Sequence, residues 1–138
     1  GPTGNPRAGW MWNQLVELGS ALAAFAKDMG TGMNSTTVVT LSEFGRRAYE
    51  NDSNGVDHGW GNATFVLGGG VNGGHVYGTW PGLGVDDMVD GDLAVTTDYR
   101  TVLADILRNR VGATIEQLGT VLPGYSGPAT FGLTKPRA

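Results

Sequence analysis

The sequence predicts an α/β fold whose elements follow the order helix, strand, strand, hairpin and helix. Two segments with apolar residues at helical spacing, residues 10–29 and 98–111, enclose two short apolar runs, residues 37–41 and 63–67. Loops that contain glycine separate these segments, and 24 of the 138 residues are glycine, well above the usual share. The pattern indicates short elements joined by long connections.

The composition excludes several classes of function. A chain of 138 residues fits one domain or a piece of one. It contains no cysteine, which excludes disulfides, cysteine-based zinc sites and thiol nucleophiles. The formal net charge is −4 and basic residues form no run, so we expect no nucleic-acid partner. No apolar stretch approaches the ~20 residues of a membrane-spanning helix, so we expect no transmembrane segment.

Residues 10–29 are predicted to form the first helix, after a Gly/Pro-rich lead-in at residues 1–9. Six apolar residues recur at alternating spacings of four and three, which places them on one helical face: Met11, Leu15, Leu18, Leu22, Phe25 and Met29. Gly30 stands where a C-terminal cap is expected. We interpret the apolar stripe as a core face.

The runs at residues 37–41 and 63–67 are almost continuously apolar, which is typical of strands buried on both faces of a parallel sheet. We expect them to be neighbouring central strands on which both long helices pack. Residues 42–62 between them form a long loop, with one helical turn near residues 46–50. Loops of this length are usually functional or disordered.

In the second half of the chain, glycines and a capping residue mark where the predicted elements begin and end. Gly68–Gly70 end the second strand, and a short hairpin strand is expected at residues 75–77. Thr97-Asp98 offers an N-cap for the helix over residues 98–111, which Gly112 ends. A further turn of helix is predicted at residues 115–118. The Gly/Pro-rich tail that follows is expected to lie on the surface.

The residues able to carry chemistry gather after the first strand. Glu43 and Arg46 follow it directly, and the same loop delivers Asp57 and His58. Ligands in open α/β sheets collect beyond the carboxyl ends of strands, and histidine is the commonest metal ligand. These groups therefore indicate a hydrolytic or metal site. Two plainer interpretations stay open: Glu43 caps the loop or pairs with Arg46 or Arg47, and His58 is an ordinary loop residue.

Three long segments of the sequence carry a family resemblance: TVVTLSEFGRRAYEN, DHGWGNATFVLGGGVNGGHVYGTWPGL and DGDLAVTTDYRTVLADILRNRVG. They resemble the C-terminal part of DUF1501 proteins, uncharacterised bacterial proteins that group with the alkaline phosphatase/sulfatase superfamily. The resemblance covers residues 10–125 and leaves residues 126–138 as a tail. It implies the C-terminal part of an alkaline-phosphatase-like α/β/α sandwich, with metal ions beyond the strand ends.

The resemblance also implies roles for the loop residues. Glu43-Phe44-Gly45 matches a segment that carries two metal ligands in the superfamily; Glu43 keeps the first position, whereas Phe44 replaces the second ligand. His58 matches a later metal-binding histidine. In this scheme Glu43 and His58 bind a divalent metal, with zinc favoured, and we expect them to converge. Asp57 would orient His58, and Arg46 would hold an anionic oxygen.

The expected function is therefore metal-dependent hydrolysis of a small phosphate or sulfate ester by the complete protein. The superfamily nucleophile lies upstream of the segments matched here, so we expect this chain to be inactive alone. We also expect it to pair with the missing N-terminal half or with another copy. Family members often carry a twin-arginine signal, which implies an exported protein. The alternative is a non-catalytic exported binding or structural protein that retains the fold.

Overall fold

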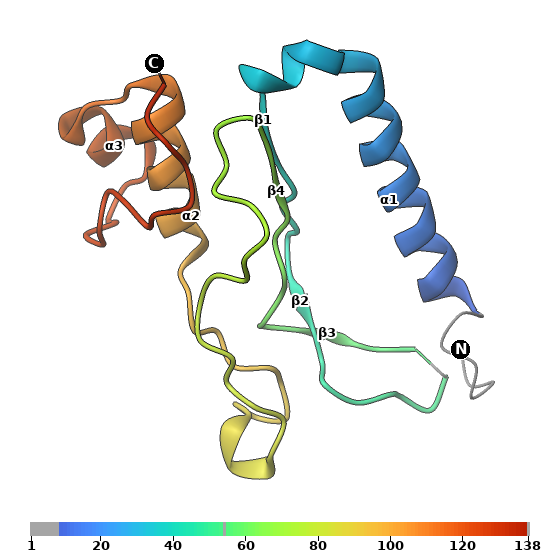
Figure 1. Cartoon of the computed structure of the whole chain (residues 1–138). Coiled ribbons are helices and arrows are strands. Elements are labelled where there is room, and N and C mark those ends of the chain that lie inside the picture. Colours follow the sequence, from blue (N-terminus) through green and yellow to red (C-terminus); the bar gives the residue numbers. More distant parts are fainter. Residues whose placement is uncertain (1–8, 54, 138) are drawn as a thin grey trace.

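A computed structural model describes residues 9–53 and 55–137 and shows helices together with short antiparallel strands (Figure 1). The helical segments are α1 (Trp10–Met29), η1 (Gly30–Asn34), η2 (Val85–Asp87), α2 (Tyr99–Ile106), η3 (Leu107–Val111) and α3 (Ile115–Val121). The strands are β1 (Thr37–Val39), β2 (Gly45–Arg46), β3 (His58–Gly59) and β4 (Val66–Gly68). The mixed α/β character expected from the sequence is confirmed.

The strands β1 and β4 pair as expected, but they run antiparallel, with Val38 opposite Leu67. The prediction of a parallel sheet is therefore wrong. Parallel strands need a crossover connection, usually a helix, whereas the chain between these two strands folds back on itself as an extended arm. All three residues of each strand are half-buried, and the two strands form a sheet of their own, so neither is a central strand.

The arm between β1 and β4 is held by a second antiparallel pair, β2 with β3. Backbone hydrogen bonds continue between the two pairs: Thr40 N donates to Phe65 O at 2.9 Å and Arg46 N donates to Gly61 O at 3.2 Å. The helical turn predicted at residues 46–50 is replaced by this ladder. Glycine is needed here, because a Cβ at Gly45 would collide with the carbonyl of Gly61.

The buried apolar core lies in the C-terminal half, between α2 and α3. Ala104, Leu118 and Leu122 form its centre. Both helices begin at capped N-termini: Asp98 accepts a hydrogen bond from Arg100 N, and Thr114 forms a reciprocal capping box with Gln117. These predicted elements are confirmed, and α3 is longer than the single turn expected.

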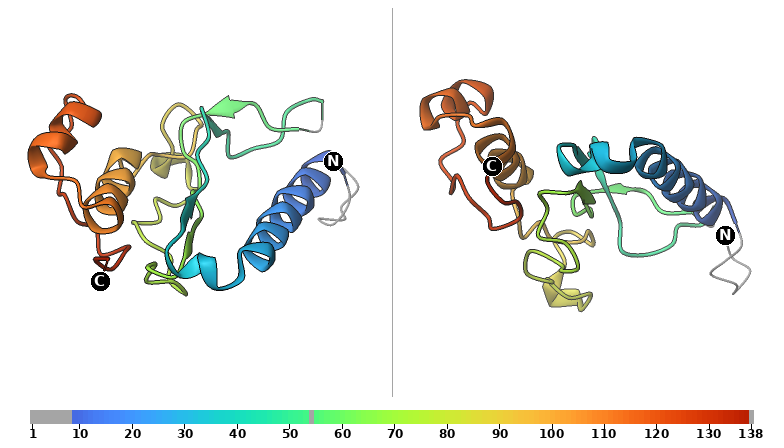
Figure 2. Two further views of the ribbon diagram at one scale, coloured as in Figure 1. Left: turned by 90° about the horizontal axis from the view of Figure 1, so that it is seen from above. Right: turned by 45° about the horizontal axis from the view of Figure 1, so that its top comes forward.

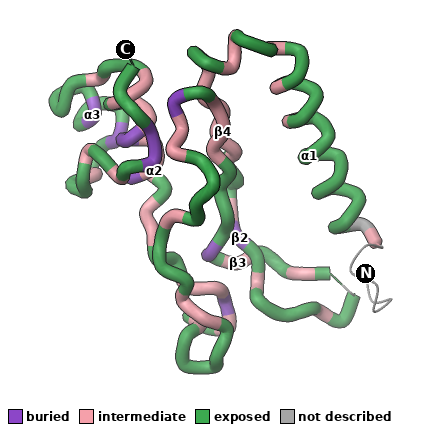
Figure 3. Tube along the Cα trace, viewed as in Figure 1, coloured by how far each residue is buried: buried purple, intermediate pink, exposed green. Residues whose placement is uncertain are grey.

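Helix α1 is confirmed over its full predicted length, but it does not pack on the sheet. Helix α1 lies on one side of the β1–β4 strand pair, and α2 and α3 lie on the other side (Figures 1 and 2). Its surface is exposed along almost the whole length (Figure 3). Within the stripe, Leu15 is 54% exposed and Phe25 is 45% exposed. The core role predicted for this stripe is therefore wrong for the chain alone.

The C-terminal segment is more firmly held than a surface tail. The carboxylate of Asp105 on α2 is completely buried and accepts hydrogen bonds from the backbone N–H groups of Phe131 (2.5 Å), Leu133 (3.3 Å) and Thr134 (2.9 Å). The Thr134 hydroxyl donates to the same carboxylate. Leu133 and Thr134 are buried as a result. The tail was expected on the surface because nothing in its composition shows that a carboxylate 26–29 residues upstream gathers it.

The hairpin strand predicted at residues 75–77 is absent from the described part of the chain. Tyr77 instead places its hydroxyl between the carbonyl oxygens of Asn72 and Gly132, at 2.8 and 3.3 Å. Val71 forms an isolated bridge with Thr134. The polypeptide after β4 therefore pairs with the C-terminal segment rather than with itself. None of the helices in residues 9–53 and 55–137 combines the length and the apolarity needed to cross a membrane.

Candidate functional site

The ladder of β2 and β3 places two of the predicted site residues opposite each other. Arg46 and His58 are direct partners in its register. Directly opposed residues of an antiparallel pair project their side chains from the same face, so a guanidinium and an imidazole share one face of this arm. Both residues are exposed to solvent. The sequence indicated that they lie in one loop, but it did not reveal this pairing.

Phe44 organises this face of the arm. Its ring stacks on the His58 imidazole, with centroids 3.7 Å apart and planes inclined by 22°. The guanidinium carbon of Arg46 lies 5.2 Å from the centroid of the same ring, within cation–π range. Arg46 also donates from Nη1 to the carbonyl of Val56 at 3.0 Å. Stacking covers a face of the imidazole and leaves the edge that carries its nitrogens, so the contact orients His58 without blocking a ligand bond.

Asp57 is engaged within its own loop. Its Oδ1 accepts a hydrogen bond of 2.7 Å from Asn51 Nδ2, and Asn51 Oδ1 accepts from the backbone N–H groups of Ser53 and Gly55. Among the described residues, no hydrogen bond joins Asp57 to His58. What the structure shows for Asp57 is therefore a role in closing the loop that presents His58.

Glu43 stands exposed between β1 and β2, next to Phe44. With His58 it supplies the two donor types that zinc takes in mixed nitrogen and oxygen sites. Within residues 9–53 and 55–137, no group of three or more His, Asp or Glu side chains lies close enough together to hold a metal ion. A catalytic zinc usually takes three protein ligands. The described residues alone therefore do not complete such a site.

Arg47 fastens the arm to the loop that precedes α2. Its Nε lies 3.0 Å from Oδ1 of Asp92, whose side chain is 7% exposed, and the two residues also form a β-bridge. The Tyr49 hydroxyl first, and the Asp92 carboxylate next, raise the pKa of Arg47 above its ordinary value. Arg47 is thus a structural cation, which leaves Arg46 as the cation available on the open face.

Residues 8–113 match the family model described as a protein of unknown function, DUF1501. The chain belongs to the DUF1501 family. The match covers about three quarters of the sequence and includes Glu43, Arg46, Asp57 and His58. No curated protein and no solved structure matches the chain.

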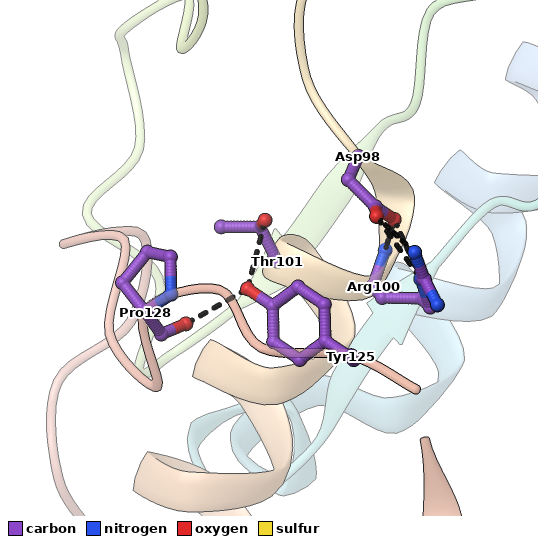
Figure 4. Close-up of polar contacts among 5 residues, drawn as sticks. All are labelled: Asp98, Arg100, Thr101, Tyr125 and Pro128. Atoms are coloured by element: carbon purple, nitrogen blue, oxygen red, sulfur yellow. Dashed lines mark hydrogen bonds and ion pairs between the residues drawn. The ribbon is translucent and has the colours of Figure 1, made fainter. Parts of the chain in front are cut away.

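A second polar cluster lies at the start of α2 (Figure 4). It connects α2, within the matched residues 8–113, to Tyr125 and Pro128, which follow them. Asp98 accepts both from Arg100 N at 2.9 Å and from the Arg100 guanidinium, whose Nη2 is 2.6 Å from Oδ2. The hydrogen bonds from Arg100 lower the pKa of Asp98, and Asp98 raises the pKa of Arg100. The Arg100 guanidinium carbon also lies 5.5 Å from the Tyr125 ring centroid.

The Tyr125 hydroxyl completes this cluster. It lies 2.9 Å from the Thr101 hydroxyl and 2.9 Å from the carbonyl oxygen of Pro128. A carbonyl can only accept, so Tyr125 donates its single proton to Pro128 and accepts from Thr101. These bonds tie the tail of the DUF1501 chain to α2. The Asp98 carboxylate and the Tyr125 hydroxyl are already paired, so we assign the cluster to stability rather than to ligand binding.

Proposed function

We propose that the β2–β3 arm is one wall of a site that binds and hydrolyses a small anionic ester of phosphate or sulfate. The observation that carries the proposal is the pairing of Arg46 with His58 on one exposed face, next to Phe44. Arg46 supplies a permanent cation for an ester oxygen, because a guanidinium pairs well with tetrahedral oxyanions. His58 and Glu43 supply donors that suit a divalent cation.

Zinc is the metal that these two donors favour, with the Glu43 carboxylate and the His58 imidazole as ligands. A bound zinc ion would polarise the ester and stabilise charge as the ester bond breaks. Because the donor set of this chain is short by at least one ligand, the proposal requires a further ligand from another polypeptide segment. Asp57 acts on His58 indirectly, by holding the loop that carries it.

The segment that supplies the missing ligand belongs, in this proposal, to the N-terminal part of a larger DUF1501 domain or to a second copy of this chain. Either would also cover apolar surface that the chain leaves exposed, such as the stripe on α1. The resemblance to exported proteins extends the proposal to a periplasmic or extracellular location. The chain alone is expected to bind zinc weakly and to leave phosphate and sulfate esters intact.

Zinc competition with a chromophoric chelator tests the assignment on the chain itself. We expect His58→Ala to raise the zinc dissociation constant at least tenfold, because one of two ligands is lost. The chain has one other histidine, His75, which is also exposed and which gives a matched control. His75→Ala should change the dissociation constant less than twofold. Equal losses in the two variants, or no loss in either, would remove His58 from the site.

A non-catalytic binding or structural role is the second candidate, and the Phe44–His58 stack favours it. In that case the His58 imidazole mainly stabilises the β2–β3 pair by stacking on the Phe44 ring, with the ring centroids 3.7 Å apart. The variant Phe44→Leu separates the two roles, since it removes the stacked ring and leaves both proposed ligands. Zinc affinity that is retained in Phe44→Leu supports the metal site. The structural role is supported instead if His58→Ala leaves zinc affinity unchanged and broadens the amide signals of the β2–β3 pair.

A further inference from the structure

A surface hollow of about 350 Å³ lies where the C-terminal segment crosses the start of β1 and the end of β4. Residues 34–35, just before β1, and residues 69–70, just after β4, line one side of it; Arg110 lines it from η3, and residues 135–137 close it. An adjoining hollow of about 320 Å³ shares Arg110 and residues 136–137, and it adds Arg108. The two hollows form one basic region around Arg110.

The charge of this region is opposite to that of the molecule. Four of the nine Lys and Arg residues line the two hollows, namely Arg108, Arg110, Lys135 and Arg137, whereas the whole chain carries a net charge of −4. Among the described residues that line the hollows, none is Asp or Glu. Asp105, which holds the same C-terminal segment, is fully buried and already accepts hydrogen bonds from that segment. The positive charge of the hollows is therefore not neutralised by a lining carboxylate.

Arg110 is held in place before any ligand arrives. Its Nη1 donates to the carbonyl of Lys135 at 3.2 Å, and its Nη2 donates to the carbonyl of Asn34 at 3.3 Å. The side chain passes so closely over Gly70 that a Cβ there would overlap the guanidinium. Its Nε is buried and has no hydrogen-bond partner within residues 9–53 and 55–137. Nη1 and Nη2 each carry two N–H groups and use one of them in these bonds, so the second N–H of each is the donor left for a ligand. A fixed guanidinium with such donors is the arrangement that recognises oxyanions.

We propose that this hollow binds a tetrahedral oxyanion, in the form of a phosphate or sulfate group. Arg110 provides the fixed fork, and Lys135 and Arg137 provide charge from the exposed rim. The hollow is several times larger than the ~30 Å³ that one water molecule occupies, so it has room for the oxyanion together with a small organic group. It lies at the opposite end of β1 from Glu43 and His58, because residues 34–35 precede that strand. The site is therefore separate from the proposed hydrolytic site and does not depend on it.

Isothermal titration calorimetry with inorganic phosphate, at constant ionic strength set by sodium chloride, tests this site. The variant Lys135→Gln removes one rim charge, and Lys27→Gln removes the same charge from an exposed residue of α1 that lines neither hollow. We expect Lys135→Gln to weaken phosphate binding at least fivefold and Lys27→Gln to change it less than twofold. Arg137→Gln should behave like Lys135→Gln. A parallel titration with glycerol 3-phosphate separates the sources, since tighter binding than free phosphate identifies a small phosphate ester as the ligand.

Amide chemical shifts locate the site independently of affinity. Phosphate should shift the backbone amides of Ser35 and Gly70, which line the hollow, and these shifts should persist in Arg46→Gln, which removes the cation of the separate β2–β3 site. Equal weakening by Lys27→Gln and Lys135→Gln would show a general charge effect and overturn the proposal. The proposal would also fail if phosphate shifts were confined to other surfaces, or if the chain did not distinguish phosphate from chloride.

Discussion

Asp105 is the single residue on which the C-terminal segment most depends. Its buried carboxylate accepts from three backbone N–H groups and from the Thr134 hydroxyl. Asp105→Ala would leave these donors without a partner, and each buried unsatisfied group costs about 1–3 kcal/mol. We expect the variant to lower the free energy of unfolding by about 3 kcal/mol or more, measured by urea denaturation. Amides of residues 131–134 should also lose protection from hydrogen exchange.

An exposed aspartate supplies the control for Asp105. Asp86 lies in η2 and is exposed, so Asp86→Ala should change the free energy of unfolding by less than about 0.5 kcal/mol. Similar losses in both variants would mean that negative charge in general, rather than the buried hydrogen bonds, stabilises the chain. Unchanged amide protection of Thr134 in Asp105→Ala would likewise contradict the role assigned to this carboxylate.

At the scale of elements, the N-cap of α2 makes stability depend on pH. Arg100 lowers the pKa of Asp98 in the folded chain, so the carboxylate binds its proton less readily there than in the unfolded chain. The stabilisation is thus complete above the ordinary aspartate pKa and is lost as pH falls through the lowered value. Asp98→Ala should cost about 1 kcal/mol at neutral pH, and this cost should shrink below about pH 4.

The cap of α3 gives a control that carries no charge. Thr114 caps that helix through its hydroxyl, so Thr114→Ala should cost about 1 kcal/mol at every pH. Urea denaturation of the wild type and both variants between pH 2.5 and 7 separates the two behaviours. A cost of Asp98→Ala that stays constant over this range would show that the hydrogen bond to Arg100 N, rather than the charge, stabilises α2.

Elements with local signals could be predicted from the sequence, and pairings between distant segments could not. The stripe of α1 and the caps at Asp98 and Gly112 lie within a few residues of the elements they define, and the structure confirms those elements. The direction of β4 relative to β1 depends on the path of the 26 residues between them, for which the sequence has no local signal. A continuous apolar run indicates burial in a sheet, but it cannot distinguish parallel from antiparallel pairing.

The same distinction applies to the candidate sites. Glu43, Arg46, Asp57 and His58 could be selected because they follow a strand within one loop, whereas their pairing across β2 and β3 appears only in three dimensions. The basic hollow was missed, because Arg110 and Lys135 are 25 residues apart in the sequence. They meet only because Asp105 holds the C-terminal segment against α2. Its one sequence signal is the alternation of basic residues at positions 108 and 110 and again at 135 and 137.

The molecule as a whole exposes more surface than a folded monomer of its size. Its accessible surface is 9471 Å², whereas a monomeric protein of 14.4 kDa exposes about 6,800 Å². Residues 1–8, 54 and 138, counted as fully unfolded chain, would account for about 1,500 Å² of the difference. The excess that remains, roughly 1,100 Å², is more than the ~800 Å² that one partner buries in a standard interface. The chain therefore presents enough surface for a stable association.

The stripe on α1 suits association with a second copy of the chain. Its spacings of four, three, four, three and four are the same in both directions, so two antiparallel copies oppose Leu15 to Phe25 and Leu18 to Leu22. A two-fold interface requires this self-complementarity. Small residues beside the stripe, Gly19 and Ala26, allow the helices to approach closely, and the six stripe residues carry no charge to repel.

Sedimentation velocity over a range of protein concentrations tests this association. We expect the wild type to form a dimer, and we expect Leu15→Glu to be monomeric, because it places a charge within the stripe. Val16→Glu introduces the same charge one residue along α1, outside the stripe, at a side chain that is similarly exposed (46% against 54%). It should leave the dimer intact. If the wild type is a monomer at all concentrations, or if both variants dissociate equally, α1 does not mediate self-association, and its apolar face is left for another segment of the DUF1501 domain.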